Sequence, residues 1–361
     1  MKSGKILIFD GARMPFREAD YELPRLKSGE ILIKNIYTTL CGSDLHTYCG
    51  KRIEKTPTVL GHEVVGKIVD FALDHNHKDF NGETLLIGDA VTWAVFAATP
   101  QTEWLEKEMP QKSNDLFKYG HAKVEDENIF HGGLGDYTIL KAHTVVLKIP
   151  AELPIPIAST VNCAVATVAG ALRLAGSISN KTVLITGLGL LGNIATAMCK
   201  IAGAKEIVTV DINSDRLNQS KRFGATKTYQ IPLQTEETPD FLLNNIDVVL
   251  EMSGAPEATE LGLDCLKVGG IAVWIGAVFK TRKIQIDAEQ IIRKLITIKG
   301  LHNYNFEDLK QALVFMTKHH GDFPFNEVVE KEFPLNEATE AFEYALNYKP
   351  LRVGIYIDEQ K

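Results

Sequence analysis

Two short segments near the start of the chain carry the side chains best suited to chemistry. Cys41 and His46 lie in the run CGSDLH, and His62 and Glu63 lie in the run GHE. Thiolate, imidazole and carboxylate groups are the ligands that zinc prefers. The residues alone leave a second interpretation open, because a lone cysteine before a glycine turn commonly serves as a small core residue.

A glycine-rich motif in the second half of the chain is typical of a dinucleotide site. Gly187, Gly189 and Gly192 form GxGxxG between the strand-like run KTVLIT and a run with a helical pattern. The first glycine permits a sharp turn, the second lets the backbone approach a pyrophosphate, and the third lets helix and strand pack closely. The pyrophosphate would lie at the helix N-terminus, where free N–H groups and the dipole favour an anion.

An acidic residue follows these glycines at the spacing that such a site requires. Asp211 ends the strand-like run EIVTVD, about 20 residues after the glycines. Its carboxylate would accept hydrogen bonds from the ribose hydroxyls and repel a 2′-phosphate, which favours NAD over NADP. Arg216 is a further candidate for the same ribose. The alternative is a ligand-free α/β domain in which the glycines only make a turn and Asp211 caps a helix.

Length and composition indicate a globular protein of two domains. The chain has 361 residues, of which 45% are hydrophobic and 24% charged, and a domain typically takes about 150 residues. The net charge is −7 without a basic run, so neither nucleic acid nor a membrane surface is an expected partner.

Cysteine usage and the N-terminal run bear on the compartment. Five scattered cysteines exclude a disulfide scaffold and a four-cysteine zinc ribbon, and they fit a reducing compartment. The apolar run at residues 6–9 is too short for a signal sequence. We therefore expect a cytoplasmic protein.

The elements that must position these residues change in type after Pro150. Before it, short strand-like runs alternate with Gly and Pro, as in a small β-barrel or sandwich. A buried helix is expected over about 157–174. After it, apolar strand-like runs alternate with helical runs, which predicts a doubly wound parallel sheet covered by helices on both faces.

These motifs together resemble the zinc-dependent medium-chain alcohol dehydrogenase family over essentially the whole chain. Two further segments add to the likeness, GDAV at 88–91 and GGLGDY at 132–137. The resemblance implies an α/β protein with a GroES-like β-barrel catalytic domain at 1–163 and 302–361. It also implies a Rossmann NAD-binding domain at 164–301.

The resemblance further implies a catalytic zinc site. Cys41, His62 and Cys163 would bind the metal, and Glu63 would hydrogen-bond near it or bind it directly. Three protein ligands leave a fourth position open, as catalytic zinc sites do. The zinc would act as a Lewis acid on the alkoxide while a hydride passes between the alcohol and NAD.

A proton relay and a set of cofactor contacts follow from the same resemblance. Ser43 and His46 match residues that pass the proton of the alcohol to solvent. Thr167 matches a cofactor-contacting threonine, and Arg352 matches a residue that binds the pyrophosphate. The complete set of cofactor candidates is Thr167, Gly187, Gly189, Leu190, Leu191, Gly192, Asp211, Arg216, Gly276, Ala277 and Arg352.

One family feature is missing from this chain. Many members carry a structural zinc on a lobe with the pattern C-x2-C-x2-C-x7-C, and the matching positions here are Thr99, Thr102, Leu105 and Ser113. None of these side chains is a thiol. We therefore expect one catalytic zinc and no structural zinc.

The substrate is less well defined than the reaction. The runs LFKYGH (116–121) and LHNY (301–304) resemble those of the phosphonate-catabolism-associated alcohol dehydrogenases. That likeness implies an anionic head group near Lys118, His121 or His302. Threonine and polyol dehydrogenases are close relatives, so the expected substrate is a small polar alcohol: a hydroxyalkylphosphonate, threonine or a polyol.

Two other functions fit parts of the pattern. One is a zinc-free NAD(P)H quinone or enone reductase of the same superfamily, which would not need Cys41, His62 and Cys163. The other is a non-catalytic cofactor-binding protein, which would need neither the ligands nor the relay. For the enzyme, a small-molecule alcohol is the expected partner, together with a second or further copies of the chain in a homodimer or homotetramer.

Replacing Asp211 tests the cofactor prediction. Asp211→Ala should weaken the preference for NAD over NADP, because the carboxylate that repels the 2′-phosphate is lost. Binding constants for the two cofactors measure the effect. Unchanged discrimination would remove Asp211 from the ribose site.

Overall fold

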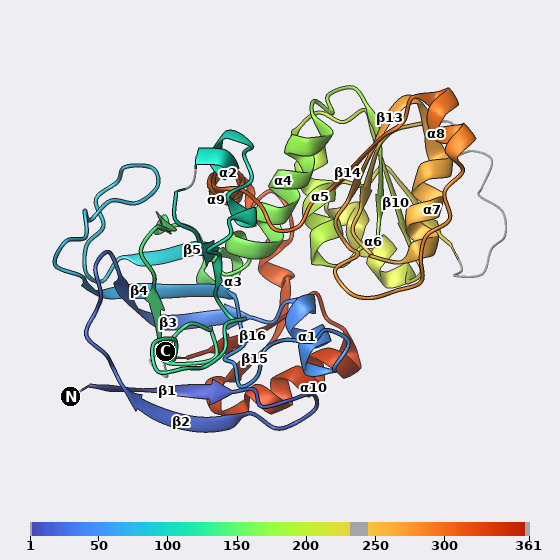
Figure 1. Cartoon of the computed structure of the whole chain (residues 1–361). Helices are drawn as coiled ribbons and strands as arrows, with labels where there is room; N and C mark the ends of the chain where they lie inside the picture. Colours follow the sequence, from blue (N-terminus) through green and yellow to red (C-terminus); the bar gives the residue numbers. More distant parts are fainter. Residues whose placement is uncertain (1, 101, 232–244, 358–361) are drawn as a thin grey trace. The chain divides into compact units, whose positions relative to one another are not determined.

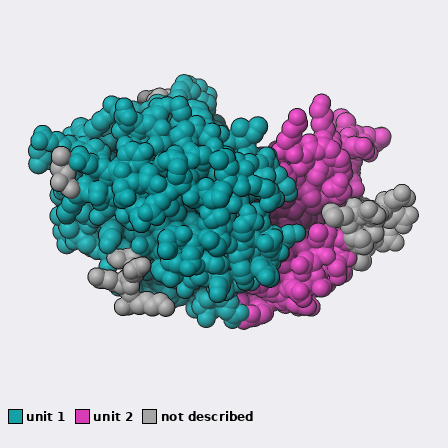
Figure 2. All heavy atoms as spheres, turned by 90° about the horizontal axis from the view of Figure 1, so that it is seen from below, with its two compact units in different colours: residues 1–166, 305–321, 325–361 teal, residues 167–304, 322–324 magenta. Residues whose placement is uncertain are grey.

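The structure is a computed structural model that describes residues 2–100, 102–231 and 245–357. The chain divides into two compact units, coloured in Figure 2. Unit 1 comprises Met1–Ala166, Asn305–Gly321 and Phe325–Lys361, and unit 2 comprises Thr167–Tyr304 and Asp322–Pro324.

Unit 1 is built on an eight-stranded sheet in the order β15-β16-β3-β4-β5-β6, with β7 paired to β3 and β8 to β5 (Figure 1). All of these pairs are antiparallel except β15 with β16. A separate antiparallel pair joins β1 to β2. The strands are β1 (Ser3–Ile8), β2 (Arg17–Glu22), β3 (Ile31–Thr39), β4 (Glu63–Phe71), β5 (Ala90–Ala97), β6 (Phe117–Lys118), β7 (Tyr137–Leu140), β8 (Thr144–Lys148), β15 (Val329–Pro334) and β16 (Arg352–Tyr356).

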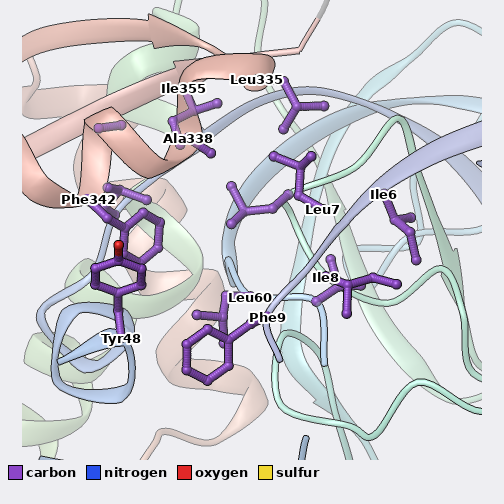
Figure 3. Packing of buried hydrophobic residues seen from close by; sticks show 14 of the residues in the cluster. Ile6, Leu7, Ile8, Phe9, Tyr48, Leu60, Leu335, Ala338, Phe342 and Ile355 are labelled. Atoms are coloured by element: carbon purple, nitrogen blue, oxygen red, sulfur yellow. The ribbon is translucent and has the colours of Figure 1, made fainter. Parts of the chain in front are cut away.

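Short helices connect and cover these strands. They are α1 (Gly42–Tyr48), α2 (Thr102–Glu106), η1 (Pro110–Lys112), α3 (Ile155–Ala158), η2 (Val161–Val165), α9 (Phe306–His319), η3 (Phe325–Glu327), η4 (Leu335–Glu337) and α10 (Ala338–Tyr348). One aromatic cluster ties α1 to α10 (Figure 3). The ring of Tyr48, at the end of α1, lies 5.0 Å from that of Phe342 in α10, and Phe16 packs on both. The helix that follows Cys41 is thereby fixed from its far end.

Unit 2 is a Rossmann-type domain with a parallel sheet in the order β11-β10-β9-β12-β13-β14. Its central strands are mostly buried, and each carries an apolar run, VLI in β9 and VVL in β12, as expected when helices cover both faces. The strands are β9 (Thr182–Thr186), β10 (Glu206–Asp211), β11 (Lys227–Gln230), β12 (Ile246–Glu251), β13 (Leu266–Trp274) and β14 (Thr297–Gly300), and the helices are α4 (Ala166–Ala175), α5 (Leu190–Ile201), α6 (Ser214–Arg222), α7 (Pro256–Cys265) and α8 (Ala288–Lys294). The predicted α/β fold, a GroES-like domain with a doubly wound parallel sheet, is confirmed.

The apolar helix predicted near the junction is present as a composite element. The run Ile155–Ala175 joins α3, η2 and α4, and is long and apolar enough to cross a membrane by length and composition alone. However, 72% of its most apolar window is buried inside the protein. A helix that is mostly buried in this way belongs to the core.

The aromatic cluster around Phe342 gives a stability prediction. Phe342 is fully buried, and Phe342→Ala should lower the free energy of unfolding by about 3–5 kcal/mol through lost burial and the cavity left behind. Urea denaturation followed by fluorescence measures this. Leu73→Ala is the control, because Leu73 is fully exposed and surface changes usually stay within about 0.5 kcal/mol. Equal effects of both substitutions would contradict the assignment of this core.

Candidate metal and cofactor sites

The pairing of β3 with β4 brings the first two candidate ligands together. Thr39, at the end of β3, lies opposite Glu63, at the start of β4. Cys41 therefore follows one strand and His62 precedes the other at the same edge of the sheet. Both side chains are buried. Two ligands that are 21 positions apart in the sequence become neighbours through one antiparallel register.

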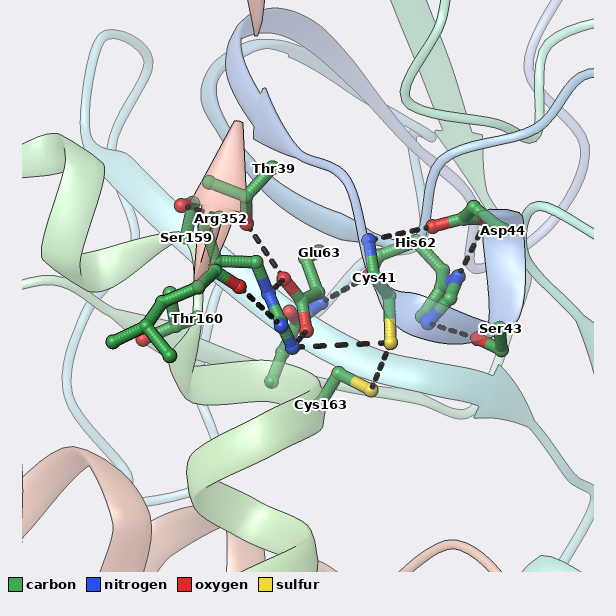
Figure 4. A network of polar contacts seen from close by, with 12 residues as sticks. Thr39, Cys41, Ser43, Asp44, His62, Glu63, Ser159, Thr160, Cys163 and Arg352 are labelled. Carbon is green, nitrogen blue, oxygen red and sulfur yellow. Dashed lines mark hydrogen bonds and ion pairs between the residues drawn. The ribbon is translucent and has the colours of Figure 1, made fainter. Parts of the chain in front are cut away.

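A buried aspartate links these two ligands (Figure 4). Asp44 is fully buried, and its carboxylate accepts a hydrogen bond from the backbone N–H of Cys41 at 3.1 Å. The other oxygen of Asp44 lies 3.2 Å from Nδ1 of His62 and accepts from the backbone N–H of Gly61 at 3.4 Å. Because Nδ1 faces Asp44, Nε2 of His62 is the nitrogen that is turned toward the metal position.

Cys163 completes the group from a different part of unit 1. It lies in η2, a short π-helical turn, a distortion that often occurs at functional sites. The side-chain amide of Asn162 donates to the backbone oxygens of His62 at 2.9 Å and Trp93 at 3.0 Å. These bonds fix the turn against β4 and β5, and Cys163 follows directly.

The geometry of the three donors fits zinc. The ligand atoms of Cys41, His62 and Cys163 all lie within 4.8 Å of one another. The sulfur atoms of the two cysteines are 4.0 Å apart, whereas two thiolates on a tetrahedral zinc lie about 3.8 Å apart. Two sulfurs and one nitrogen from the protein, with a fourth position left over, form the donor set of a catalytic zinc.

Electrostatics prepare the two thiols unequally. The hydrogen bond from Cys163 lowers the pKa of Cys41 well below its ordinary value, and His62 and Arg352 act in the same direction. The pKa of Cys163 is raised well above its ordinary value by this hydrogen bond and by burial. Coordination by both sulfurs requires that a metal ion displace the remaining thiol protons.

Glu63 and Arg352 form a buried ion pair beside the thiols. The guanidinium of Arg352 donates to both carboxylate oxygens of Glu63, each at 2.7 Å, and Thr39 donates a third bond at 2.7 Å. Nη2 of Arg352 also lies 3.9 Å from the sulfur of Cys41. Burial raises the pKa of Glu63, and Arg352 opposes this effect.

The contacts of Glu63 and Arg352 can be compared with the roles that the sequence predicts for them. Both oxygens of Glu63 are bonded to other groups, and Glu63 does not join the three clustered donors. Arg352 is buried and paired with Glu63. Direct ligation by Glu63 and pyrophosphate binding by Arg352 remain predictions.

The two relay candidates lie on α1 beside the metal ligands. The hydroxyl of Ser43 is 3.4 Å from Nε2 of His62, which places it next to the metal position. His46 follows one turn later, and residues three apart on a helix share a face. Burial lowers the pKa of His46, with a further contribution from Lys51. A neutral imidazole is the form that accepts a proton.

The glycine motif of unit 2 has the shape of a phosphate-binding turn. Gly187 has a φ of +86°, and a Cβ there would contact Ser253 at 2.6 Å. A Cβ at Gly192 would overlap the carbonyl oxygen of Gly187, whereas one at Gly189 would meet nothing within 4 Å. Packing thus requires glycine at 187 and 192, whereas the backbone of Gly189 is open to a ligand. Leu190 and Leu191 then begin α5.

Asp211 lies at the end of β10 and is bonded to this turn. Its carboxylate accepts from the N–H of Leu188 at 2.7 Å and of Asn213 at 2.9 Å. The segments that follow β12 and β13 also approach each other closely, because a Cβ at Gly254 would meet the backbone of Gly276. Asp211 ends β10 and Gly276 follows β13, so both lie at the carboxyl end of the same parallel sheet, where such sheets bind ligands.

For the remaining three cofactor candidates, the structure gives a position in the fold. Ala277 follows Gly276 beyond the end of β13, Arg216 lies in α6, and Thr167 lies in α4 at the start of unit 2. The structure gives none of them a contact that specifies a cofactor role, so these assignments stay predictions.

Asp44 is the site residue that sequence reasoning did not single out. Its signal was local: an acidic residue three positions after Cys41, where it caps the first turn of a helix. Arg52 and Glu54 were not singled out either, because the contacts of Glu54 with Arg52 at 2.7 Å and with His121 at 3.2 Å form only in the folded unit.

Comparisons with known proteins agree with the fold and show the family. The Alcohol dehydrogenase GroES-like domain model matches residues 27–151, and the Zinc-binding dehydrogenase model matches residues 191–318. L-threonine 3-dehydrogenase from Pyrococcus abyssi is 30% identical over 295 residues, 78% of this chain and 78% of its own length. The enzyme of that name from Shewanella frigidimarina is 29% identical and covers 78% of this chain and 80% of its own length.

A solved structure extends this likeness. The alcohol dehydrogenase from Thermotoga maritima superposes with a TM-score of 0.91 at 22% identity, covering 99% of this chain and 100% of its own. The chain belongs to the zinc-dependent alcohol dehydrogenase family. It is a zinc-dependent oxidoreductase that uses NAD(P) as its cofactor and acts on small alcohols.

Removing the third candidate ligand tests the metal site. Cys163→Ala should abolish stoichiometric zinc binding and activity while leaving the fold intact, because two donors do not hold zinc in a catalytic site. Zinc content by mass spectrometry and circular dichroism measure both effects. Cys199→Ala is the control, since Cys199 is a buried cysteine of α5. Undiminished zinc in Cys163→Ala would show that another residue is the third ligand.

Replacing Asp44 tests its positioning role. Asp44→Asn removes the charge that orients His62 but keeps the shape, and zinc affinity should fall about 10–100-fold. Competition with a chromogenic chelator measures the affinity. Asp70→Asn makes the same change at an exposed position of β4 and should leave affinity unchanged. Equal affinities for the two variants would argue against the link from Asp44 to the metal.

Proposed function

We propose that this protein is an NAD-dependent dehydrogenase of a small polar alcohol whose zinc is held by Cys41, His62 and Cys163. The observation that carries the proposal is the convergence of three zinc-type donors within 4.8 Å in unit 1. The same chain supplies a nucleotide-binding turn in unit 2 with an acidic residue at the next strand end.

The reaction exchanges two electrons and two protons in all. An alcohol and NAD+ give a carbonyl compound, NADH and a proton, and the reverse reaction consumes them. When bound, zinc supplies a Lewis acid that lowers the pKa of the alcohol, and the nicotinamide supplies the hydride acceptor. Every other task falls to side chains of the chain itself.

Residues of α1 and its neighbours carry the proton and hold the ligands. The hydroxyl of Ser43, beside His62, would accept the proton of the alcohol while it releases its own proton onward, and His46 would pass a proton to solvent. Asp44 keeps His62 in the orientation that exposes Nε2. The buried pair of Glu63 and Arg352 sets the charge next to the two thiolates.

Asp211 supports NAD as the cofactor rather than NADP. Its carboxylate lies at the end of β10 next to the glycine turn. A 2′-phosphate there would meet a negative charge, whereas a free ribose hydroxyl would find an acceptor.

Three substrate classes are proposed for testing. Threonine is supported by the names of relatives at 26–30% identity, all L-threonine 3-dehydrogenases. A hydroxyalkylphosphonate is supported by the runs LFKYGH and LHNY, and a polyol by the general likeness to polyol dehydrogenases. A cytoplasmic homodimer or homotetramer with a single zinc per chain completes the proposal.

A single experiment separates the proposal from its rivals. Protein purified with measured zinc content is mixed with NAD and a panel of hydroxyalkylphosphonates, threonine and polyols, and NADH formation is followed. Turnover that requires both zinc and an alcohol supports the dehydrogenase. Zinc-independent reduction of quinones or enones by NADPH would favour the reductase, and no turnover with zinc and NAD both bound would favour a binding protein.

A further inference from the structure

A fully buried carboxylate ends a central strand of unit 2. Glu251 is the last residue of β12 and is 0% exposed. Its register neighbours are Thr186, which ends β9, and Trp274, which ends β13. A strand covered by helices on both faces normally carries apolar side chains. Within the residues that the structure describes, no cation pairs with Glu251, and a buried charge without a cation is unfavourable unless other groups bind it.

The groups that bind Glu251 come from the turn that follows β12, residues 252–255, which we call the central turn. Oε1 of Glu251 accepts from the backbone N–H of Ser253 at 2.7 Å and from that of Gly254 at 2.8 Å, and the hydroxyl of Ser253 donates to it as well. This hydroxyl in turn accepts from the N–H of Ala255 at 3.0 Å. Burial raises the pKa of Glu251, and the hydrogen bonds from the central turn oppose the rise. One side chain thereby fixes the path of this turn.

The central turn is packed tightly between two other turns. A Cβ at Gly187 would lie 2.6 Å from the Cβ of Ser253. On the other side, a Cβ at Gly276 would overlap the backbone nitrogen of Gly254. The N–H of Gly276 also donates to the backbone oxygen of Glu251 at 3.2 Å. Because no space for a side chain remains on either side, a shift of the central turn must displace its neighbours.

The position of the central turn in the sheet is the one where ligands bind. In the strand order β11-β10-β9-β12-β13-β14, the chain runs outward from β9 to β11 and then returns to the other side of β9 as β12. Parallel sheets of this kind bind ligands outside the carboxyl ends of the strands, at the point where the strand order reverses. Gly187 and Gly276, on the two sides of the central turn, are both candidates for cofactor contacts.

We propose that Glu251 is a positioning residue for the dinucleotide. Its carboxylate holds the central turn, and this turn sets the separation between the turns at Gly187 and Gly276. The inference rests on the proposed NAD site of unit 2, and it adds a residue that acts on the cofactor only through the backbone of its neighbours. Without the carboxylate, the N–H groups of Ser253 and Gly254 would lose their acceptor, and the turn would rearrange to reach other partners.

Cofactor binding by variants of Glu251 tests the inference. NADH is titrated into the zinc-loaded protein, and its fluorescence and calorimetry give the Kd. Glu251→Ala should weaken binding about tenfold or more, whereas Glu251→Gln keeps an acceptor oxygen and should restore most of the affinity. Zinc content should match wild type in both variants, because the three metal-ligand candidates belong to unit 1. A Kd of Glu251→Ala equal to that of wild type would overturn the proposal.

Val248→Ala is the matched control for lost packing. Val248 is fully buried in the same strand and pairs with Val183 and Ile271. Thermal unfolding should show that Val248→Ala and Glu251→Ala are both folded and less stable than wild type, whereas only Glu251→Ala should bind NADH more weakly. Equal weakening of NADH binding in both variants would assign Glu251 a structural role and would overturn the proposal.

Ser253→Ala provides a test that does not depend on the folding of Glu251→Ala. The substitution removes one donor to the carboxylate and should weaken NADH binding by about twofold or more. Added to Glu251→Ala, it should have little further effect, because its hydroxyl has already lost its acceptor. Unchanged affinity in Ser253→Ala, or losses that simply multiply in the double variant, would contradict an action through the central turn.

The wild-type protein separates failure of the inference from failure of the cofactor site. Wild-type protein that binds no NADH would contradict the proposed NAD site, and the inference with it. Wild-type protein that binds NADH with the same Kd as the variants of Glu251 and Ser253 would contradict the inference alone.

Discussion

The buried carboxylate of Asp44 is the interaction on which the metal site depends. A charged group without solvent is unfavourable unless donors surround it, and here the backbone N–H groups of Cys41 and Gly61 and the ring of His62 do so. One side chain thereby joins the end of β3, the start of α1 and the start of β4. The aromatic contacts of Tyr48 then fix the other end of α1. Core packing and metal geometry are thus coupled through a single helix of two turns.

In unit 2, close packing of the backbone fixes the shape of the glycine turn at the candidate site. Gly187 and Gly192 are required because any side chain there would collide with neighbouring residues. Asp211 closes the turn by accepting the N–H of Leu188. The same carboxylate that stabilises the loop is the one proposed to select the cofactor.

Local patterns predicted local features well, and contacts between distant segments less well. The alternation of strand-like and helical runs gave the α/β fold, because periodicity reports which faces are buried. Cys41 and His62 stood out by residue type, but Cys163 followed only from a family resemblance, since about 100 residues separate it from His62 and no spacing rule spans that distance. The ion pair of Arg352 with Glu63 joins β16 to β4, and no sequence pattern in either strand predicts it.

The bonds made by Asn162 bear on how such a site changes during evolution. Its amide holds the third ligand in place by binding two backbone carbonyls, those of His62 and Trp93. Every amino acid supplies a carbonyl, so substitutions in β5 that preserve the strand leave this anchor in place. The ligand turn is therefore insulated from drift in the sheet beneath it. The sequence around a metal centre can diverge to low identity when backbone groups hold the metal ligands in position.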